Sequence, residues 1–95
     1  MSFSEDAAAV LHEMEGKQLY AKKLEKIRKA LGFLETDPRH PGLNTHKYQS
    51  VEGPNKEPVF EAYVENDTPG AWRIWFWYGP QKGHITVLAI GPHPD

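Results

Sequence analysis

The sequence predicts an α+β domain of two layers, in which an N-terminal helical hairpin packs on one face of a small antiparallel sheet. Apolar residues recur at helical spacing in the first third of the chain and alternate at strand spacing in its second half. Residues 71–78 form an almost uninterrupted aromatic and aliphatic run, which favours a strand. A length of 95 residues fits a single domain, residues 1–95, with one core.

The composition narrows the class of protein. Hydrophobic residues make up 39% of the chain and charged residues 25%, which is typical of a folded globular protein. No apolar run reaches membrane-spanning length and the N-terminus lacks the features of a signal peptide, so we expect a cytoplasmic protein that does not bind membranes. The absence of cysteine excludes disulfides and thiolate chemistry. Because the formal net charge is -2, any binding to nucleic acid must rest on a local basic patch.

Two helices are predicted in the first third of the chain. The first runs from Ser4, a suitable N-cap, to near Gly16. The second covers residues 17–35 and is stopped by Asp37 and Pro38. The first helix follows the i, i+3, i+4, i+7 rule with Ala7, Val10, Leu11 and Met14. The second carries one continuous apolar stripe of Tyr20, Leu24, Ile27, Leu31 and Leu34. These stripes predict the helical side of the core.

The remaining chain predicts a long loop and three strands. Residues 38–58 hold four prolines and two of the glycines, so an irregular loop is expected there. Residues 59–66 alternate as a half-buried strand and are followed by a turn over residues 67–70. Residues 71–78 and 84–90 then form a hairpin joined by a five-residue loop, with Tyr78 opposite His84 and Arg73 near Ala89. His93 then lies just beyond the Arg73 end of the hairpin, so we expect Arg73 and His93 to line one concave site. In the first strand of this hairpin, alternation places Arg73, Trp75 and Trp77 on one face.

Basic residues on the second helix lie opposite its apolar stripe. The candidates for RNA binding there are Lys22, Lys23, Lys26 and Lys29. A solvated helix surface with Glu25 interspersed is the ordinary explanation. Contact with phosphates is the functional alternative, and it would supply affinity and orientation without reading sequence.

Four residues of the long loop suit metal-free cleavage of RNA: Arg39, His40, His46 and Lys47. One group must take the 2′-hydroxyl proton, a cation must stabilise the phosphorane, and another group must protonate the leaving 5′-oxygen. Histidine suits both proton roles, because imidazole titrates near neutrality. The ordinary alternative is a surface loop whose histidines cap or form hydrogen bonds. The five histidines form no short ligand pair on one element, so we expect neither a metal nor a cofactor.

The hairpin face that carries Arg73, Trp75 and Trp77 is either a binding surface or part of the packed interior. The indoles either stack on RNA bases or partners, or they pack over the core. Arg73 either clamps a phosphate or pairs with Glu61 or Glu65 of the neighbouring strand.

Several segments, taken in order, resemble the RelE/ParE toxin superfamily of bacterial toxin–antitoxin modules. The resemblance begins near Lys17 and extends to the end of the chain. The segments that carry it are residues 36–43, His46–Lys47, residues 59–64, residues 72–74 and residues 90–95. The resemblance implies two helices on a small antiparallel sheet of three strands, or four if Met1, Ser2 and Phe3 supply the N-terminal strand of the family.

The resemblance also implies a function. RelE-type members cleave mRNA on the ribosome, and ParE-type members poison DNA gyrase. By this resemblance Arg73 contacts the scissile phosphate, His93 is the general acid, and His46 and Lys47 supply further basic groups. The expectation is therefore a toxin of a type II module that acts as a metal-independent mRNA endoribonuclease and binds a cognate antitoxin. The alternative is a non-catalytic module of the same fold that binds an antitoxin, gyrase or a second copy of itself. The sequence leaves the general base unassigned.

Overall fold

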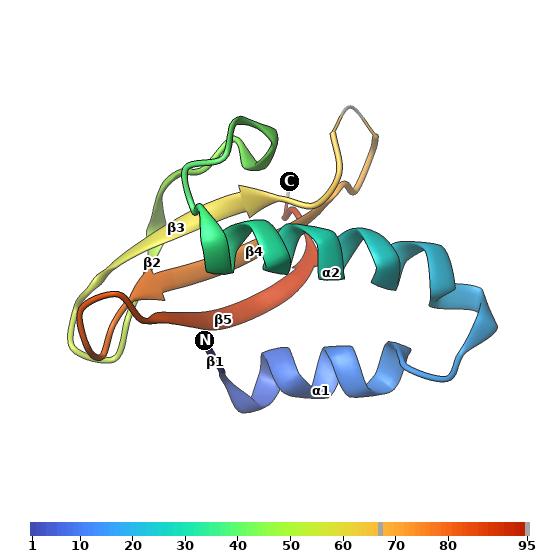
Figure 1. Ribbon diagram of the computed structural model, residues 1–95, viewed down its shortest axis with the longest axis horizontal. Helices are drawn as coiled ribbons and strands as arrows, with labels where there is room; N and C mark the ends of the chain where they lie inside the picture. Colours follow the sequence, from blue (N-terminus) through green and yellow to red (C-terminus); the bar gives the residue numbers. More distant parts are fainter. Residues whose placement is uncertain (67, 95) are drawn as a thin grey trace.

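The computed structural model describes residues 1–66 and 68–94 and has the predicted α+β architecture. Helices α1 (Glu5–Met14) and α2 (Ala21–Thr36) lie on one face of a five-stranded sheet (Figure 1). The strands are β1 (Ser2–Phe3), β2 (His46–Glu52), β3 (Pro58–Tyr63), β4 (Trp72–Tyr78) and β5 (Ile85–Pro92). Their spatial order is β1-β5-β4-β3-β2. The sheet is mixed, because β1 runs parallel to β5 and the other neighbouring strands are antiparallel.

The N-terminal segment joins the helical layer to the sheet. The Ser4 hydroxyl accepts a hydrogen bond from the Ala7 backbone N–H at 3.0 Å, which confirms the predicted cap of α1. The same hydroxyl donates to the Leu88 carbonyl at 2.6 Å, so the start of α1 is fixed to β5. A 3₁₀ turn over Gln18–Tyr20 precedes α2, which therefore begins four residues later than predicted. No helix in the described part of the chain is long and apolar enough to cross a membrane.

The apolar stripe of α2 forms the helical side of the main core, as predicted. Leu24, Ile27 and Leu34 are buried in it, whereas Tyr20 and Leu31 are partly buried at its margin. The sheet contributes mainly the side chains Ala62, Ile74, Phe76, Val87 and Ile90. Burial of this stripe, rather than helix propensity, is the main stabilisation expected for a helix of this length.

The prediction of an irregular loop over residues 38–58 is wrong for its centre, which forms β2. This strand lies at the edge of the sheet and has mostly exposed side chains, so its sequence shows no alternation of apolar and polar residues. The other edge strand, β1, contains two residues and supplies the additional N-terminal strand. The sheet thus has five strands where three or four were expected.

The sheet face away from the helices carries a second, smaller core. Val59, Trp75 and Trp77 are buried in it, and Tyr48 and Leu88 pack against them. The ring of Trp77 covers the backbone of Gly79, where a Cβ would lie 2.3 Å from the indole. The prediction that β3 is half-buried is therefore wrong, because Val59 and Glu61 on its outer face are buried as well.

The register of the β4–β5 hairpin differs from the prediction. Arg73 lies opposite Gly91 rather than Ala89, since Tyr78 pairs with Ile85 and a bulge adds one further residue to β5. The chain still leaves β5 beside Arg73: the His93 backbone N–H donates to the Ala71 carbonyl at 2.9 Å.

Candidate functional site

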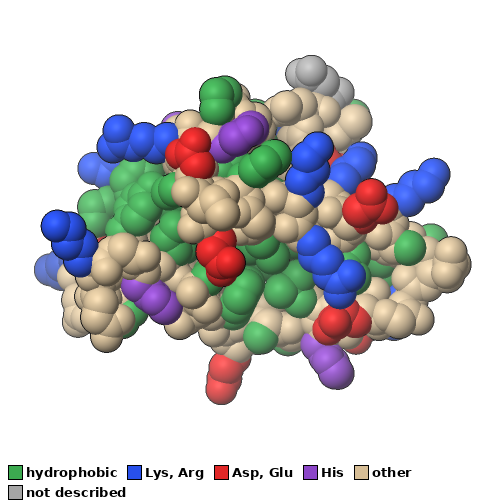
Figure 2. Space-filling model, in the orientation of Figure 1, with side chains coloured by type: hydrophobic (Ala, Val, Ile, Leu, Met, Phe, Trp, Pro, Cys, Tyr) green, Lys and Arg blue, Asp and Glu red, His purple; other side chains and the backbone are tan. Residues whose placement is uncertain are grey.

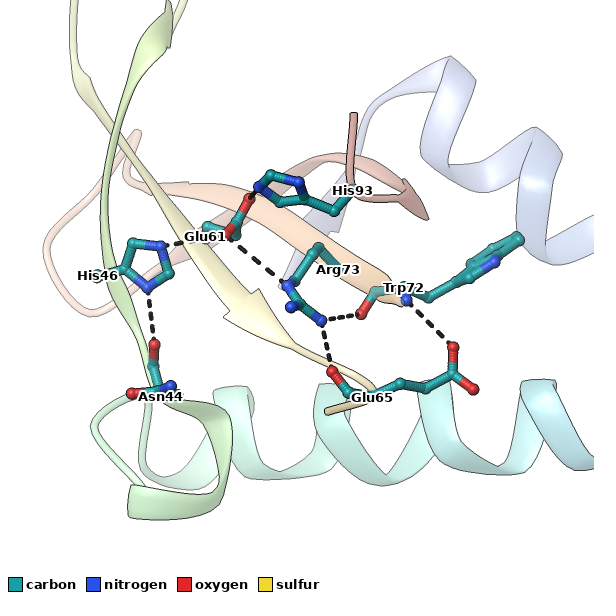
Figure 3. A network of polar contacts seen from close by, with 7 residues as sticks. All are labelled: Asn44, His46, Glu61, Glu65, Trp72, Arg73 and His93. Carbon is teal, nitrogen blue, oxygen red and sulfur yellow. Dashed lines mark hydrogen bonds and ion pairs between the residues drawn. The ribbon is translucent and has the colours of Figure 1, made fainter. Parts of the chain in front are cut away.

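A buried carboxylate, Glu61, lies at the centre of the polar cluster in Figure 3. Its side chain is only 2% exposed, although it carries an ionisable group. His46 Nε2 lies 3.1 Å from Glu61 Oε1, and Arg73 Nε lies 3.8 Å from the same oxygen. His93 Nε2 lies 3.5 Å from the other oxygen, Oε2. Two imidazoles and one guanidinium therefore surround a single carboxylate.

Strand pairing explains why these residues meet on one face. His46 on β2 lies directly opposite Glu61 on β3, and Tyr63 on β3 lies directly opposite Arg73 on β4. Glu61 and Tyr63 are two residues apart, so both project to the same side of the sheet. His93 follows the end of β5, next to the first residues of β4. Four segments that are far apart in the sequence thus converge on the face away from the helices.

The Arg73 guanidinium is held by backbone carbonyls and by an aromatic ring. One terminal nitrogen donates to the Glu65 carbonyl at 2.5 Å and to the Trp72 carbonyl at 3.2 Å. The guanidinium carbon lies 3.6 Å from the ring centroid of Tyr63, a cation–π contact. These contacts fix the direction of a side chain that is almost fully buried.

The side chain of Glu65 connects this region to α2. Its carboxylate accepts hydrogen bonds from Lys23 Nζ at 2.8 Å and from the Trp72 backbone N–H at 3.1 Å. Lys26 Nζ lies 3.6 Å from its second oxygen. The hydrogen bond from Lys23 holds the pKa of Glu65 below its ordinary value, helped by the Trp72 N–H and the two lysine charges and opposed by burial. Two of the lysines predicted to bind RNA are therefore paired with a carboxylate.

The two ring nitrogens of His46 both face oxygen acceptors. Nδ1 lies 2.9 Å from the Asn44 carbonyl, and Nε2 faces Glu61. An imidazolium satisfies both acceptors, because each of its nitrogens then carries a hydrogen. The ring also meets Tyr63 edge-on, with centroids 5.8 Å apart. His46 is thus positioned to orient the carboxylate of Glu61.

These groups line an open cavity of about 330 Å³, which we call the Glu61 cavity. Its lining residues are His46, Glu61, Tyr63, residues 68–71, Arg73 and His93. The predicted convergence of Arg73 and His93 on one concave site is confirmed. A carboxylate, two imidazoles and a guanidinium can together accept a proton, donate a proton and stabilise an anion.

Other predicted site residues lie outside the Glu61 cavity. Lys47 follows His46 on β2 and therefore projects to the opposite face of the strand. Trp75 and Trp77, at 8% and 6% exposure, are packing residues of the second core. Arg39 lines a neighbouring depression that also includes His46.

The remaining candidates are on or beside α2. Lys22 is exposed on α2, whereas Lys29 and His40 line a separate cavity beside this helix. Figure 2 shows that basic side chains on this face are interspersed with acidic ones.

Sequence reasoning missed two residues of the site, Glu61 and Tyr63. The sequence predicts Glu61 only as a structural partner for Arg73, and it predicts no site role for Tyr63. The sequence does show that both residues lie on the same face of one predicted strand and that the next predicted strand carries Arg73. The further signal, that His46 faces Glu61, depended on β2, which was predicted to be a loop.

Within residues 1–66 and 68–94, no group of three or more His, Asp or Glu side chains is arranged to hold a metal ion. When compared with known proteins, the chain matches no protein-family model, no curated protein and no solved structure.

Proposed function

We propose that this chain is an endoribonuclease that cleaves RNA by attack of a ribose 2′-hydroxyl on the adjacent phosphorus. The observation that carries the proposal is the Glu61-centred cluster. Cleavage of this kind needs a proton acceptor, a proton donor and a cation close to one phosphodiester. Glu61, His93 and Arg73 are suitable types for these roles, and the histidine and arginine nitrogens lie 3.5 and 3.8 Å from the carboxylate.

The proposed step assigns one role to each group. The substrate displaces His93 from Glu61 Oε2, and the freed carboxylate takes the 2′-hydroxyl proton while the 2′-oxygen forms a bond to phosphorus. The bond between phosphorus and the 5′-oxygen breaks, and the His93 imidazolium donates its proton to that oxygen. The products are a 2′,3′-cyclic phosphate and a 5′-hydroxyl, so no co-reactant is consumed. Arg73 stabilises the negative charge that develops on the phosphorane.

His46 acts as a positioning residue in this proposal. Its Nδ1 contact with the Asn44 carbonyl fixes the ring, and its Nε2 contact holds one oxygen of Glu61. The opposite oxygen faces His93, which projects from the rim of the cavity. The role of general acid for His93 is the one that the resemblance to RelE-type toxins implies.

We further propose, from the same resemblance, that the cellular role is that of a toxin in a type II toxin–antitoxin module. The substrate is then mRNA on the ribosome, and a cognate antitoxin is the inhibitory partner. Lys22 and Lys29 are the basic residues of α2 that form no ion pair with any described residue, so they are the better candidates for phosphate contacts.

The rival proposal is a non-catalytic binding module of the same fold. In a binding module, Trp75 and Trp77 were expected to be the exposed side chains that contact the partner protein. Both indoles are buried, so this aromatic surface is not available for binding. The placement of ionisable groups around Glu61 favours the nuclease.

Induced expression in bacteria tests the proposal against this rival. The nuclease predicts growth arrest with cleaved transcripts for the wild type and neither effect for His93→Ala. His12→Ala, which changes an exposed histidine on α1, is the matched control and is expected to behave as the wild type. Equal toxicity of the wild type and His93→Ala without cleaved transcripts would instead support the binding module.

A further inference from the structure

A second cavity, of about 430 Å³, lies between α2, the 3₁₀ helix Pro41–Leu43 and the segment that follows β3. We call it the α2 pocket. It is distinct from the Glu61 cavity, but Tyr63 and Thr68 line both. The two cavities therefore share two lining residues at the same end of the sheet.

Among the described residues, the rim of the α2 pocket has two basic side chains, Lys26 and Lys29, and one acidic side chain, Glu65. Lys26 and Lys29 are three residues apart on α2 and project from the same side of the helix. The acidic residue in the lining, Glu65, is also paired with Lys23. Lys29 forms no ion pair with the described residues, and its ammonium lies 5.9 Å from the ring centroid of Phe33. Despite the net charge of -2, this site therefore favours an anionic ligand.

The wall of the pocket is aromatic and held in place. The rings of Phe33 and His40 are stacked, with centroids 3.9 Å apart and an interplanar angle of 7°. His40 Nδ1 accepts a hydrogen bond from the Gly42 backbone N–H at 3.0 Å, which orients the ring. The proton of the neutral ring is therefore on Nε2, where it can be donated.

We propose that the α2 pocket is a subsite for a nucleotide of the RNA strand next to the scissile bond. The base packs against the Phe33–His40 wall, and its phosphate contacts Lys29. A strand whose scissile phosphate lies beside Arg73 reaches this pocket across Tyr63 and Thr68. The inference rests on the proposed ribonuclease function, and it explains how a chain of negative net charge binds a polyanion.

The test measures binding separately from cleavage. Fluorescence anisotropy with a labelled RNA octamer is carried out in the His93→Ala background, so that the RNA stays intact. Lys29→Glu in this background is expected to raise the Kd about tenfold, through loss of the phosphate contact and local charge reversal. The matched control is Lys82→Glu, which makes the same charge change at an exposed position of the β4–β5 turn. It is expected to change the Kd less than threefold.

Equal effects of Lys29→Glu and Lys82→Glu would overturn the subsite, since both would then report only the overall charge. Cleavage of a dinucleotide by the wild type tests the ribonuclease proposal alone, because its single phosphate is the scissile one and it therefore has no phosphate to contact Lys29. Binding of the octamer that depends on Lys29, together with no cleavage of RNA with or without ribosomes, would keep the pocket as a nucleic-acid site and reject the nuclease.

Discussion

Replacement of the buried carboxylate by an amide of the same size, Glu61→Gln, tests what balances the charge of Arg73. Two unit charges 3.8 Å apart attract each other by about 4 kcal/mol at an effective dielectric constant of 20. The cost of keeping Glu61 out of water offsets part of this attraction. In the variant Arg73 keeps its two backbone carbonyls and the Tyr63 ring. We therefore expect a loss of about 2 kcal/mol, below the roughly 3 to 5 kcal/mol seen when a buried charge loses its only partner.

The assay is thermal unfolding followed by circular dichroism. A loss of this size corresponds to a fall in Tm of roughly 8 to 16 °C for a domain of this length. Glu52→Gln, on the exposed edge strand β2, is the control and is expected to stay within about 0.5 kcal/mol of the wild type. If Glu61→Gln and Glu52→Gln have the same Tm, the Glu61 carboxylate does not balance the charge of Arg73 and our account of the site is wrong. In RNA cleavage, loss of a general base predicts a fall in kcat of about 10² to 10⁴.

Three further predictions concern stability. Ile27→Ala removes a fully buried side chain of the main core and is expected to cost about 2 to 5 kcal/mol in urea unfolding; an unchanged midpoint would reject the stripe as core. Trp75→Ala is expected to cost about 3 to 5 kcal/mol because its indole fills the second core, whereas an exposed anchor would leave stability intact. The pKa of Glu65 is lower in the folded than in the unfolded protein. Its ion pair therefore stabilises the fold fully at pH values above the unfolded-state pKa, and this stabilisation is lost as the pH falls through the folded-state pKa. Glu65→Gln should thus be about 1 kcal/mol less stable than the wild type at neutral pH and equal to it in strong acid; a deficit that is independent of pH would contradict the ion pair.

The helical layer and the hairpin were predictable, because their signals are local. The stripe of α2 repeats over several turns, and the aromatic run of β4 favours a strand wherever it lies in the sheet. The strand β2 was not predictable, since an edge strand with mostly exposed side chains needs no apolar pattern. The bulge in β5 was also missed, because it depends on how the two strands twist against one another.

The residues of the candidate site also differ in whether the sequence could predict them. Arg73 was found because it is conspicuous locally, as a charge in an apolar run, whereas the role of His93 came from the resemblance to the RelE/ParE superfamily. Glu61 was seen only as a possible ion-pair partner, because its central position depends on β2 delivering His46 to its other side. From the sequence, Trp75 and Trp77 could be either buried packing residues or exposed binding residues. Only the packing around β4 distinguishes these two interpretations.

The most direct test of the central claim is the chemical nature of the ends of RNA cleaved by the purified protein. An RNA oligonucleotide is incubated with wild-type protein in the presence of a chelator, and the products are identified by mass spectrometry. Our account predicts 5′ fragments that end in a 2′,3′-cyclic phosphate, 3′ fragments that begin with a 5′-hydroxyl, and cleavage at least about 10²-fold slower by Glu61→Gln or His93→Ala. Fragments that carry a 5′-phosphate, or cleavage by either variant at the wild-type rate, would contradict it.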